Sequence, residues 1–310
     1  MTETHIVPVE LDGARADRAV AVLCGVSRRT ARDAAAAGGV VRSGEALAGS
    51  TRVALGDALH VVVETTEPVM LPEPDVAFEI AYEDDSVLVV DKPAGLVVHP
   101  GAGRSGGTLA NGLLARYPEI EALGDEHRWG IVHRIDRETS GLLIVAKQPA
   151  AFEFLQAALQ RREVKRDYRA LVVGEFPSAM GTIEAPIGRD PADPTRMAAI
   201  ESGRPARTHY RRLAEWSEAD VSYAALALET GRTHQIRVHM RSIGHPVVGD
   251  SVYGPRRAIA GDPGRTWLHA ASLAFEHPSG SGLMNVASEL PADLSTSLDR
   301  LGAPSFGSAV

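Results

Sequence analysis

Hydrophobic and polar residues change from a helical period to an alternating one within the first 66 positions. Apolar residues return every three or four positions over 14–24 and again over 28–37, which predicts two short helices. Glycines follow both segments, and Ser27 stands where it can cap the second helix. Shorter β-type runs follow up to residue 63. This part of the chain is therefore expected to form a small α+β domain, with residues 1–10 as a loose arm or a first strand.

A proline-rich stretch separates this first domain, residues 1–66, from the rest of the chain. Residues 67–77 hold three prolines and three acidic residues, a composition typical of a linker. The periodic patterns resume near Phe78. We therefore expect a second, larger domain over residues 78–310.

Strand patterns outnumber helical patterns in this second domain. Alternation with a period of two predicts strands, most clearly over 164–174 and 222–229. An amphipathic pattern over 149–162 predicts a helix, and residues 186–209, rich in arginine, proline and glycine, predict a loop. Strands and helices do not alternate regularly. We therefore expect an α+β fold with a mixed, mainly antiparallel central sheet and flanking helices.

The charge of the chain is unevenly distributed. The net charge is −8 over 310 residues, yet residues 127–257 hold 20 basic and 15 acidic side chains, whereas residues 67–126 hold 3 and 12. All but three of the basic residues are arginines, which suit bidentate phosphate contacts and stacking on bases. Nucleic-acid binding requires a local basic surface, so the acidic total does not exclude it.

Composition and motif spacing argue against several kinds of site and against a membrane or secreted protein. The single cysteine, Cys24, excludes an internal disulfide and a cysteine-rich zinc site. No apolar run approaches the roughly 18 residues of a membrane span, and no signal-peptide pattern begins the chain, so we expect a cytoplasmic protein. Five histidines follow residue 233, but their spacing does not match a His-Glu-x-x-His site, and no metal is expected. The glycines over 101–107 lack the Gly-Lys-Ser/Thr of a phosphate loop, which argues against a nucleotide cofactor.

The stretch Gly130–Lys147 brings charge next to a predicted core strand. His133, Arg134 and Asp136 are followed by the turn signal Thr139–Gly141 and by an apolar run typical of a buried strand. Charge in such a position is costly unless it is paired or used. One interpretation is a structural ion pair between Asp136 and an arginine, and the other is a functional carboxylate.

The sequence His133-Arg134-Ile135-Asp136 resembles the His-Arg-Leu-Asp signature of the RluA-type pseudouridine synthases, with isoleucine in place of leucine. Further similarities to this family occur in the family's order along residues 87–280. They are Asp91–Gly95 with His99-Pro100, Lys165–Gly174, the nearly intact block Leu228–His239, Gly244–Gly254 and His269–Gly280. Several long motifs in one order are far more specific than any single one.

The resemblance implies conversion of a uridine in RNA to pseudouridine, which requires no redox cofactor and no group donor. The family's catalytic aspartate, active-site tyrosine and active-site arginine match Asp136, Tyr168 and Arg237. We expect Asp136 to act as nucleophile or base and Arg237 to hold it. We expect Tyr168 to stack on the detached uracil or to transfer a proton, although its strand pattern alone is that of a core residue. Contacts to RNA or to the uridine are expected from His99, His133, Arg134, Arg232 and His234.

Residues 13–65 resemble the S-four-type RNA-binding domain, with Ser43-Gly44 in place of its usual Asn-Gly turn. Arg28, Arg29 and Arg32 lie on the second helix and are expected to contact RNA phosphates, and an accessory domain without RNA contact is the alternative. This domain combination resembles the large-subunit ribosomal RNA enzymes of the family. Transfer RNA is the alternative substrate, because some relatives modify it. We expect a monomer.

Two other classes of function fit parts of the sequence. A non-catalytic RNA-binding or ribosome-assembly factor would keep the fold, but it would not need Asp136, Tyr168 and Arg237 together. A hydrolase using His133 and Asp136 would need a nucleophile turn or a pair of carboxylates, and the sequence has neither motif. The catalytic interpretation is therefore preferred.

Overall fold

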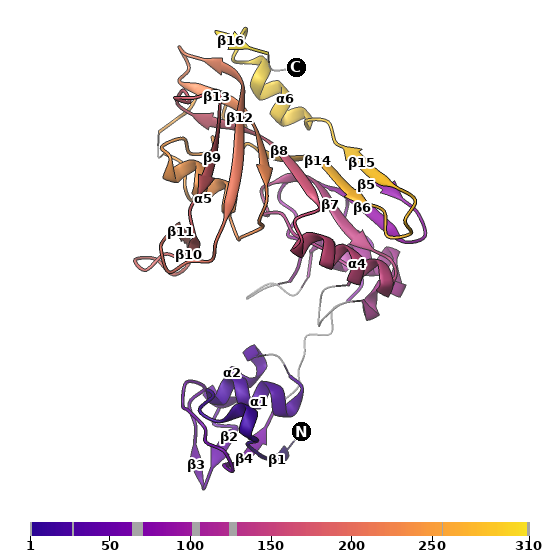
Figure 1. Cartoon of the computed structure of the whole chain (residues 1–310), viewed down its shortest axis with the longest axis vertical. Helices are drawn as coiled ribbons and strands as arrows, with labels where there is room; N and C mark the ends of the chain where they lie inside the picture. Colours follow the sequence, from indigo (N-terminus) through magenta and orange to yellow (C-terminus); the bar gives the residue numbers. More distant parts are fainter. Residues whose placement is uncertain are drawn as a thin grey trace. The chain divides into compact units, whose positions relative to one another are not determined.

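The chain divides into two compact units, Met1–Val69 and Met70–Val310. The computed structural model describes residues 2–26, 28–63, 71–100, 106–123, 129–255 and 257–308, and Figure 1 labels their helices and strands. No helix in these ranges is long and apolar enough to cross a membrane.

The first unit is a small α+β domain with an antiparallel sheet in the order β1-β4-β2-β3. Its elements are β1 (Thr2–Ile6), η1 (Val9–Leu11), α1 (Ala16–Cys24), α2 (Arg28–Ala36), β2 (Val40–Arg42), β3 (Glu45–Ala46) and β4 (Ala58–Val62). Both helices bury alanines against the sheet, where Leu59 and Val61 are inaccessible to solvent. Gly25 ends α1 in the left-handed region, with φ 64°, which favours glycine.

Two predictions for this part of the chain fall outside the described residues. They concern the capping residue Ser27 and the side chain of Arg29. Of the predicted linker 67–77, residues 71–77 are described and belong to the second unit. There Glu73 accepts hydrogen bonds from the backbone N–H of Gly107, at 2.9 and 3.1 Å. This end of the stretch is therefore fixed to the second unit.

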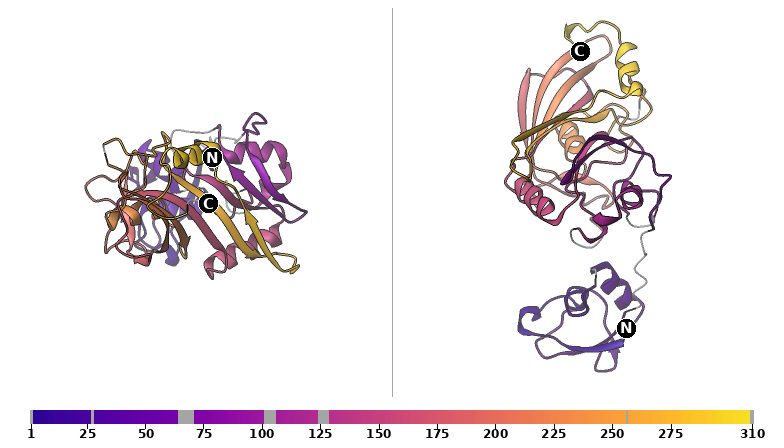
Figure 2. Two further views of the ribbon diagram at one scale, coloured as in Figure 1. Left: turned by 90° about the horizontal axis from the view of Figure 1, so that it is seen from above. Right: turned by 90° about the vertical axis from the view of Figure 1, so that its right-hand side faces the viewer.

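A sheet of ten strands organises the described part of the second unit, and Figures 1 and 2 show that it is strongly twisted. The order is β16-β12-β13-β8-β14-β7-β6-β5, with β15 on β14 and β9 on β12. Among the described strands of this sheet, only β7 and β14 pair in parallel. The strands are β5 (Glu79–Glu83), β6 (Val87–Lys92), β7 (Ser140–Ala146), β8 (Lys165–Val173), β9 (Met180–Glu184), β12 (Arg207–Trp216), β13 (Val221–Leu228), β14 (Leu268–Glu276), β15 (Leu283–Ala287) and β16 (Phe306–Gly307). The predicted mixed, mainly antiparallel sheet is confirmed.

Helices cover both faces of the sheet at β6 and β7. The helices of this unit are α3 (Leu109–Arg116), η2 (Pro118–Ala122), α4 (Pro149–Gln160), α5 (Gln235–Ser242) and α6 (Ala292–Asp299). Successive strand residues point to opposite faces, so Leu143 and Val145 of β7 pack with α3, whereas Leu142 and Ile144 pack with α4. Every residue of β7 is buried as a result. The strand that follows Asp136 is therefore held from both sides.

The predicted loop over 186–209 is wrong for two short segments. β10 (Ile187–Arg189) and β11 (Met197–Ala199) form an antiparallel hairpin there, and β12 begins at Arg207. Ile187 and Met197 pack with Val238 and Tyr253, which lie later in the chain. Strands of three residues have almost no periodic signal, so this distant packing decides their conformation.

Candidate active site

Asp136 lies in the loop 132–139, immediately before strand β7. Two backbone hydrogen bonds shape the loop. Thr139 N–H donates to the Asp136 carbonyl at 3.1 Å, and Gly95 N–H donates to the Arg137 carbonyl at 2.8 Å. The position of the carboxylate is therefore fixed by its own turn and by the segment that follows β6.

Gly141 marks the point where this loop enters the sheet. Its φ is 106°, and a Cβ there would lie 2.2 Å from the carbonyl oxygen of Ala270 on β14. Only glycine meets both demands, because it has no side chain and tolerates positive φ. The close approach of β14 thus fixes the end of the loop.

Lys92, the last residue of β6, supports the same loop from inside the protein. Its side chain is fully buried, and its ammonium group donates to the carbonyl oxygens of Pro93, Leu96 and Arg137 at 2.8, 2.8 and 3.1 Å. Burial lowers the pKa of Lys92 to about 7, although nearby carboxylates oppose the shift. The lysine therefore ties the residue next to Asp136 to the end of β6.

We expect Lys92→Met to change how stability depends on pH. The pKa of this lysine is about 7 in the folded protein and near 10.5 when unfolded. The unfolded chain therefore holds more protons between these values, and wild-type stability gains up to about 1.4 kcal/mol per pH unit as the pH rises. Melting temperatures of both proteins between pH 7 and 9 measure the effect. The variant should lack this gain, whereas Lys147→Met, at a lysine paired with Glu83, should retain it.

Arg237, on helix α5, joins Asp136 to a second carboxylate, Asp250. Its Nη1 donates to Asp136 Oδ2 at 3.1 Å, while Nε and Nη2 donate to the two oxygens of Asp250 at 2.7 and 2.8 Å. Asp250 Oδ1 also accepts the backbone N–H groups of Val252 and Tyr253. The Asp250 side chain is 0% exposed and that of Asp136 is 18% exposed. The bidentate pair with Asp250 orients the guanidinium, and the remaining nitrogen meets the more accessible carboxylate.

Two opposing effects determine the charge of this buried pair. Burial by itself would lower the pKa of Arg237 and raise the pKa of Asp250. Their hydrogen bonds and opposite charges outweigh burial, so the pKa of Arg237 lies above its ordinary value and the pKa of Asp250 lies below. The Tyr253 ring lies 5.0 Å from the guanidinium carbon and adds a cation–π contact. The group facing Asp136 is therefore a permanent cation.

A small cleft of about 80 Å³ opens beside Asp136. Arg166 and Tyr168 lie on one face of β8, two positions apart, and both line the cleft. Tyr168 is 5% exposed, and burial raises the pKa of its phenol to about 12, so the hydroxyl keeps its proton at neutral pH. The other described residues that line the cleft are Arg134, Ile135, Thr139, Leu228, Gly231, Arg232, Thr233, His234, Gln235, Ile236 and Leu268.

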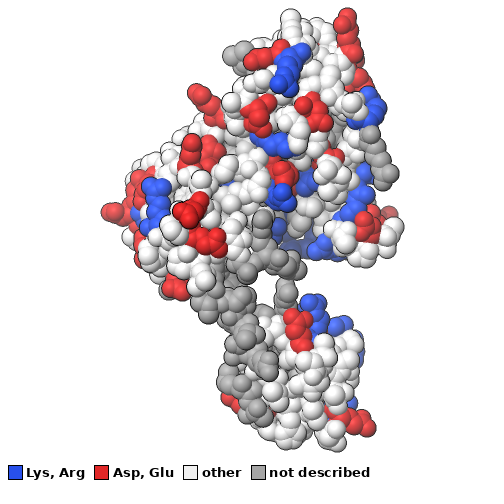
Figure 3. All heavy atoms as spheres, turned by 180° about the vertical axis from the view of Figure 1, so that it is seen from behind, with Lys and Arg blue, Asp and Glu red and all other residues white. Residues whose placement is uncertain are grey.

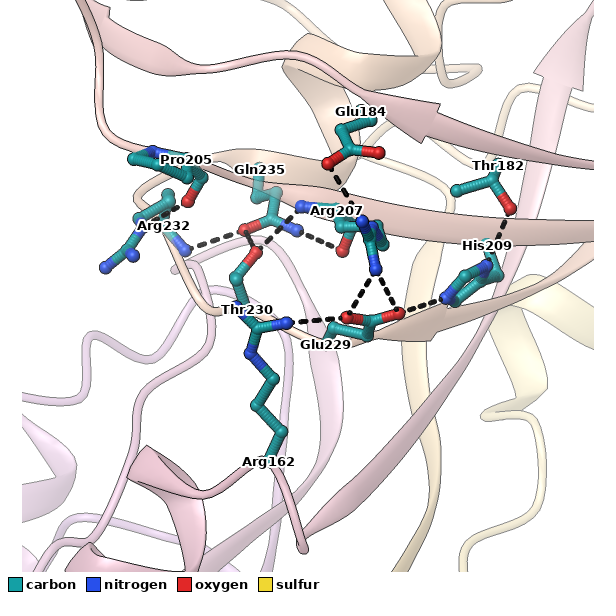
Figure 4. Close-up of polar contacts among 10 residues, drawn as sticks. All are labelled: Arg162, Thr182, Glu184, Pro205, Arg207, His209, Glu229, Thr230, Arg232 and Gln235. Atoms are coloured by element: carbon teal, nitrogen blue, oxygen red, sulfur yellow. Dashed lines mark hydrogen bonds and ion pairs between the residues drawn. The ribbon is translucent and has the colours of Figure 1, made fainter.

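Residues 231–234 line the cleft, and we call the segment 229–234 that contains them the cleft wall. The side chain of Gln235 holds this wall in place, as Figure 4 shows. Gln235 Oε1 accepts from the Thr230 hydroxyl at 2.8 Å and from the Arg232 N–H at 3.0 Å, while its Nε2 donates to the Arg207 carbonyl. Arg232 Nε donates to the Pro205 carbonyl, and its outer nitrogens carry no contact in this network. The wall is therefore rigid, with a guanidinium projecting from it.

Glu229 gathers basic side chains at the start of this wall. It pairs with Arg162 at 2.9 Å, with Arg207 at 3.3 Å and with His209 at 2.8 Å. Hydrogen bonding to His209, followed by that to Arg207, lowers the pKa of Glu229 despite the opposing effect of its partial burial. Figure 4 shows that Arg162 reaches Glu229 from a different segment than the other two. This network ties the end of β13 to β12 and to the turn after α4.

Three of the predicted RNA-binding residues, Arg134, Arg232 and His234, line the cleft. Arg134 is exposed. His234 Nδ1 lies 2.9 Å from the Tyr253 hydroxyl, and its backbone adopts φ 56° at the start of α5. Such a conformation is strained in a residue other than glycine and is held by the surrounding contacts.

The structure does not bring His133 or His99 to the cleft lining. His133 Nε2 accepts the backbone N–H of Ile144 at 3.2 Å, and burial, reinforced by the charge of Arg166, lowers its pKa to about 3. Its ring is therefore neutral and supports β7. His99 is half-buried and is absent from the described residues that line the cleft.

The predicted arginines of the first unit lie on α2. Arg28 donates to Asp17 at 3.1 Å, and Arg32 lies 3.9 Å from Asp33, yet both arginine side chains are 62% exposed. A hydrogen bond from Arg15, with further help from Arg28, lowers the pKa of Asp17 to about 2. Arg28 is therefore partly neutralised, whereas Arg32 keeps an open guanidinium.

A larger cavity of about 790 Å³ opens elsewhere in the second unit, beside Lys92, Arg265 and His269. Some of its polar groups are paired with one another: Arg265 with Asp293 at 2.6 Å, and His269 with the Ser140 hydroxyl at 3.0 Å. It does not include Asp136, Tyr168 or Arg237. The smaller cleft is therefore the candidate site, because the candidate carboxylate Asp136 lines it together with Tyr168.

The arrangement suits chemistry at a carbon that becomes electron-poor. A carboxylate oriented by a guanidinium offers a nucleophile or base, and the buried phenol and apolar side chains offer a floor for a flat ring. Within the described ranges, no group of three His, Cys, Asp or Glu side chains could hold a metal ion. On the face of the second unit drawn in Figure 3, acidic and basic side chains are interspersed. That face therefore carries no continuous patch of one sign.

Comparisons with known proteins indicate the family of this chain. The family model of RNA pseudouridylate synthases matches residues 86–242. A relative in Chloroflexus aurantiacus, described as an uncharacterized RNA pseudouridine synthase, is 53% identical over 68% of this chain and 65% of that protein. The ribosomal large subunit pseudouridine synthase D of Neisseria meningitidis is 43% identical over 94% of this chain and 81% of that protein. The solved structure of human RNA Pseudouridylate Synthase Domain Containing 1 superposes with a TM-score of 0.59 at 30% identity, covering 74% of this chain and 90% of that one.

Proposed function

The chain belongs to the RNA pseudouridylate synthase family, and from this premise we propose that its substrate is large-subunit ribosomal RNA. The observation that carries the proposal is the similarity over 94% of this chain to a ribosomal large subunit enzyme. That similarity includes most of the first unit as well as the catalytic one. The reaction turns a uridine into its carbon-linked isomer, with no net change in composition.

We propose that Asp136 acts on the sugar. When the bond from C1′ to the ring nitrogen breaks, C1′ becomes electron-poor, and the carboxylate acts as nucleophile or base there. Arg237 orients it through the hydrogen bond at 3.1 Å, and Asp250 fixes Arg237 in turn. The carboxylate is thus presented to the cleft in one direction before substrate arrives.

Tyr168 and Arg134 have separate roles in this proposal. Tyr168, buried on β8, supplies the surface on which the detached uracil stacks. Because its pKa is raised to about 12, it works as a neutral phenol, and any proton transfer by its oxygen is slow at neutral pH. A uridine must leave the RNA stack to reach the cleft. Arg134, exposed at the entrance, fills the vacated space or holds a flanking phosphate.

We also propose that the first unit is an S-four-type domain that binds RNA. The exposed guanidinium of Arg32 and the partly paired one of Arg28 supply phosphate contacts from α2. The protein is proposed to act as a cytoplasmic monomer. Light scattering should therefore give the mass of one chain, 32.9 kDa.

Mapping of pseudouridine tests the substrate. Purified protein is incubated with unmodified large-subunit ribosomal RNA, with small-subunit ribosomal RNA and with transfer RNA, and each product is mapped at single-nucleotide resolution. The expected result is one or a few modified positions in the large-subunit RNA. Modification of transfer RNA alone would contradict the ribosomal proposal, and no pseudouridine in any RNA would contradict the activity.

A further inference from the structure

Arg166 is a buried arginine that lines the cleft, and no hydrogen bond or ion pair joins its guanidinium to another described side chain. Its side chain lies on β8 and the residue is 7% exposed. Nε is enclosed without a hydrogen-bond partner, and across the part of the chain that the structure describes Arg166 has no ion pair. Nearly all buried polar groups in proteins are hydrogen-bonded, and buried charges are paired. An exception in a catalytic cleft therefore requires a reason.

The neighbours of Arg166 do not neutralise it. Asp167, the next residue, points to the opposite face of β8, where its carboxylate accepts from the Ser272 hydroxyl at 3.4 Å. His133 is neutral because its pKa is about 3. The absence of a side chain at Gly231 leaves space for the guanidinium, since a Cβ there would lie 2.8 Å from Arg166 Nη1. The cleft is thus shaped to hold a positive charge that forms no direct ion pair with any described residue.

The place of Arg166 relative to Asp136 and Tyr168 indicates which part of the substrate it faces. Asp136 and Tyr168 line the same cleft, and Arg166 lies on the same face of β8 as Tyr168, about 6.6 Å from it toward the start of the strand. With the sugar at Asp136 and the uracil stacked on Tyr168, the guanidinium of Arg166 faces the edge of the uracil ring. That edge carries carbonyl oxygens, which accept hydrogen bonds.

We propose that Arg166 is a catalytic residue that stabilises the uracil as it leaves the sugar. In that step the C1′–N1 bond breaks, its electron pair stays on the uracil, and the negative charge spreads over N1 and the two carbonyl oxygens. Arg166 donates to a carbonyl oxygen and supplies the missing opposite charge. The ring then forms the C5–C1′ bond with its own electrons, C5 loses its proton, and N1 gains one. No oxidant, reductant or co-reactant is consumed.

The structure favours this ligand over an RNA phosphate. A phosphate remains on the backbone of the strand, whereas a guanidinium that is 7% exposed, inside a cleft of about 80 Å³, is reached by a flat ring more readily than by a backbone. Exposed arginines are present for phosphate, including Arg134 at the entrance of the cleft. An unpaired buried cation also gains most when negative charge develops beside it during the reaction.

The test separates the chemical step from RNA binding and rests on the proposed function. An RNA in which the wild-type protein forms pseudouridine is used in single-turnover reactions at saturating protein. For Arg166→Met we expect the rate constant to fall by about 10²-fold or more, with the Kd for RNA changed less than about threefold. Arg166→Lys keeps the charge without the planar fork and should recover at least about tenfold. Lys165→Met, at the exposed neighbour, serves as the control and should match the wild type.

Other outcomes overturn the inference. A weaker Kd with an unchanged rate constant, together with a salt dependence lowered by about one counterion, would assign Arg166 to a phosphate. An unchanged rate constant in the folded Met variant, checked by circular dichroism, would assign it no role. If the Met variant does not fold, Arg166→Gln and Arg166→Lys are compared instead, and equal wild-type rates in both refute the proposal. A wild-type protein that forms no pseudouridine would refute the proposed function itself.

Discussion

Replacing Asp136 by asparagine is expected to abolish pseudouridine formation, with a loss of at least about 10⁴-fold in rate. Asparagine has the same shape and still accepts a hydrogen bond from Arg237, which donates to Asp136 at 3.1 Å in the native protein. It is neither a nucleophile nor a base at the sugar. The variant should therefore fold and bind RNA while the chemical step stops. Release of tritium from C5 of labelled uridine in ribosomal RNA measures that step.

A neighbouring carboxylate supplies the matched control for Asp136→Asn. Glu138 lies two residues along the same loop, is partly exposed and pairs with Arg137 at 3.0 Å. Glu138→Gln removes one negative charge from the loop, as Asp136→Asn does, and should keep activity within about threefold of the wild type. Equal tritium release by Asp136→Asn and the wild type would refute the catalytic assignment, even if both proteins bind RNA equally.

Arg237→Met is expected to reduce both activity and stability. It leaves Asp250, which is 0% exposed, as an uncompensated buried charge, and this should cost about 3–5 kcal/mol of unfolding free energy. It also frees Asp136 from its orienting donor, so we expect the rate to fall by at least about 10²-fold. Urea unfolding and single-turnover assays measure the two losses. Arg241→Met, at an exposed arginine of the same helix, should cause neither.

A double substitution separates the two roles of Arg237. Adding Asp250→Asn to Arg237→Met removes the unpaired charge but keeps an oxygen that accepts the backbone N–H groups of Val252 and Tyr253. The stability lost in the single variant should then be largely recovered. Activity should stay low, because Asp136 still lacks its donor. Recovery of activity together with stability would show that Arg237 acts only on folding.

Periodicity by itself determined most of the local structure. The predicted helices over 14–24, 28–37 and 149–162 correspond to α1, α2 and α4, and the predicted strands over 164–174 and 222–229 correspond to β8 and β13. These segments are long enough for their apolar residues to repeat on one face, and that repeat is a property of neighbours in the chain. The hairpin β10–β11 was missed because each strand is three residues long and is held by packing from Val238 and Tyr253.

The sequence also indicated candidate residues for the chemistry, but it could not show how they meet. Asp136 and Arg237 stand 101 positions apart, and their hydrogen bond exists because the fold brings the loop before β7 next to helix α5. The bidentate support from Asp250 and the buried, unpaired state of Arg166 have no sequence signal, because both depend on which groups lie nearby in space. Residue type and local periodicity can be read directly from neighbouring positions in the sequence. The burial of a side chain, its ion pairs and its distance from remote residues are decided only by the tertiary structure, because they depend on which segments the sheet and helices bring together.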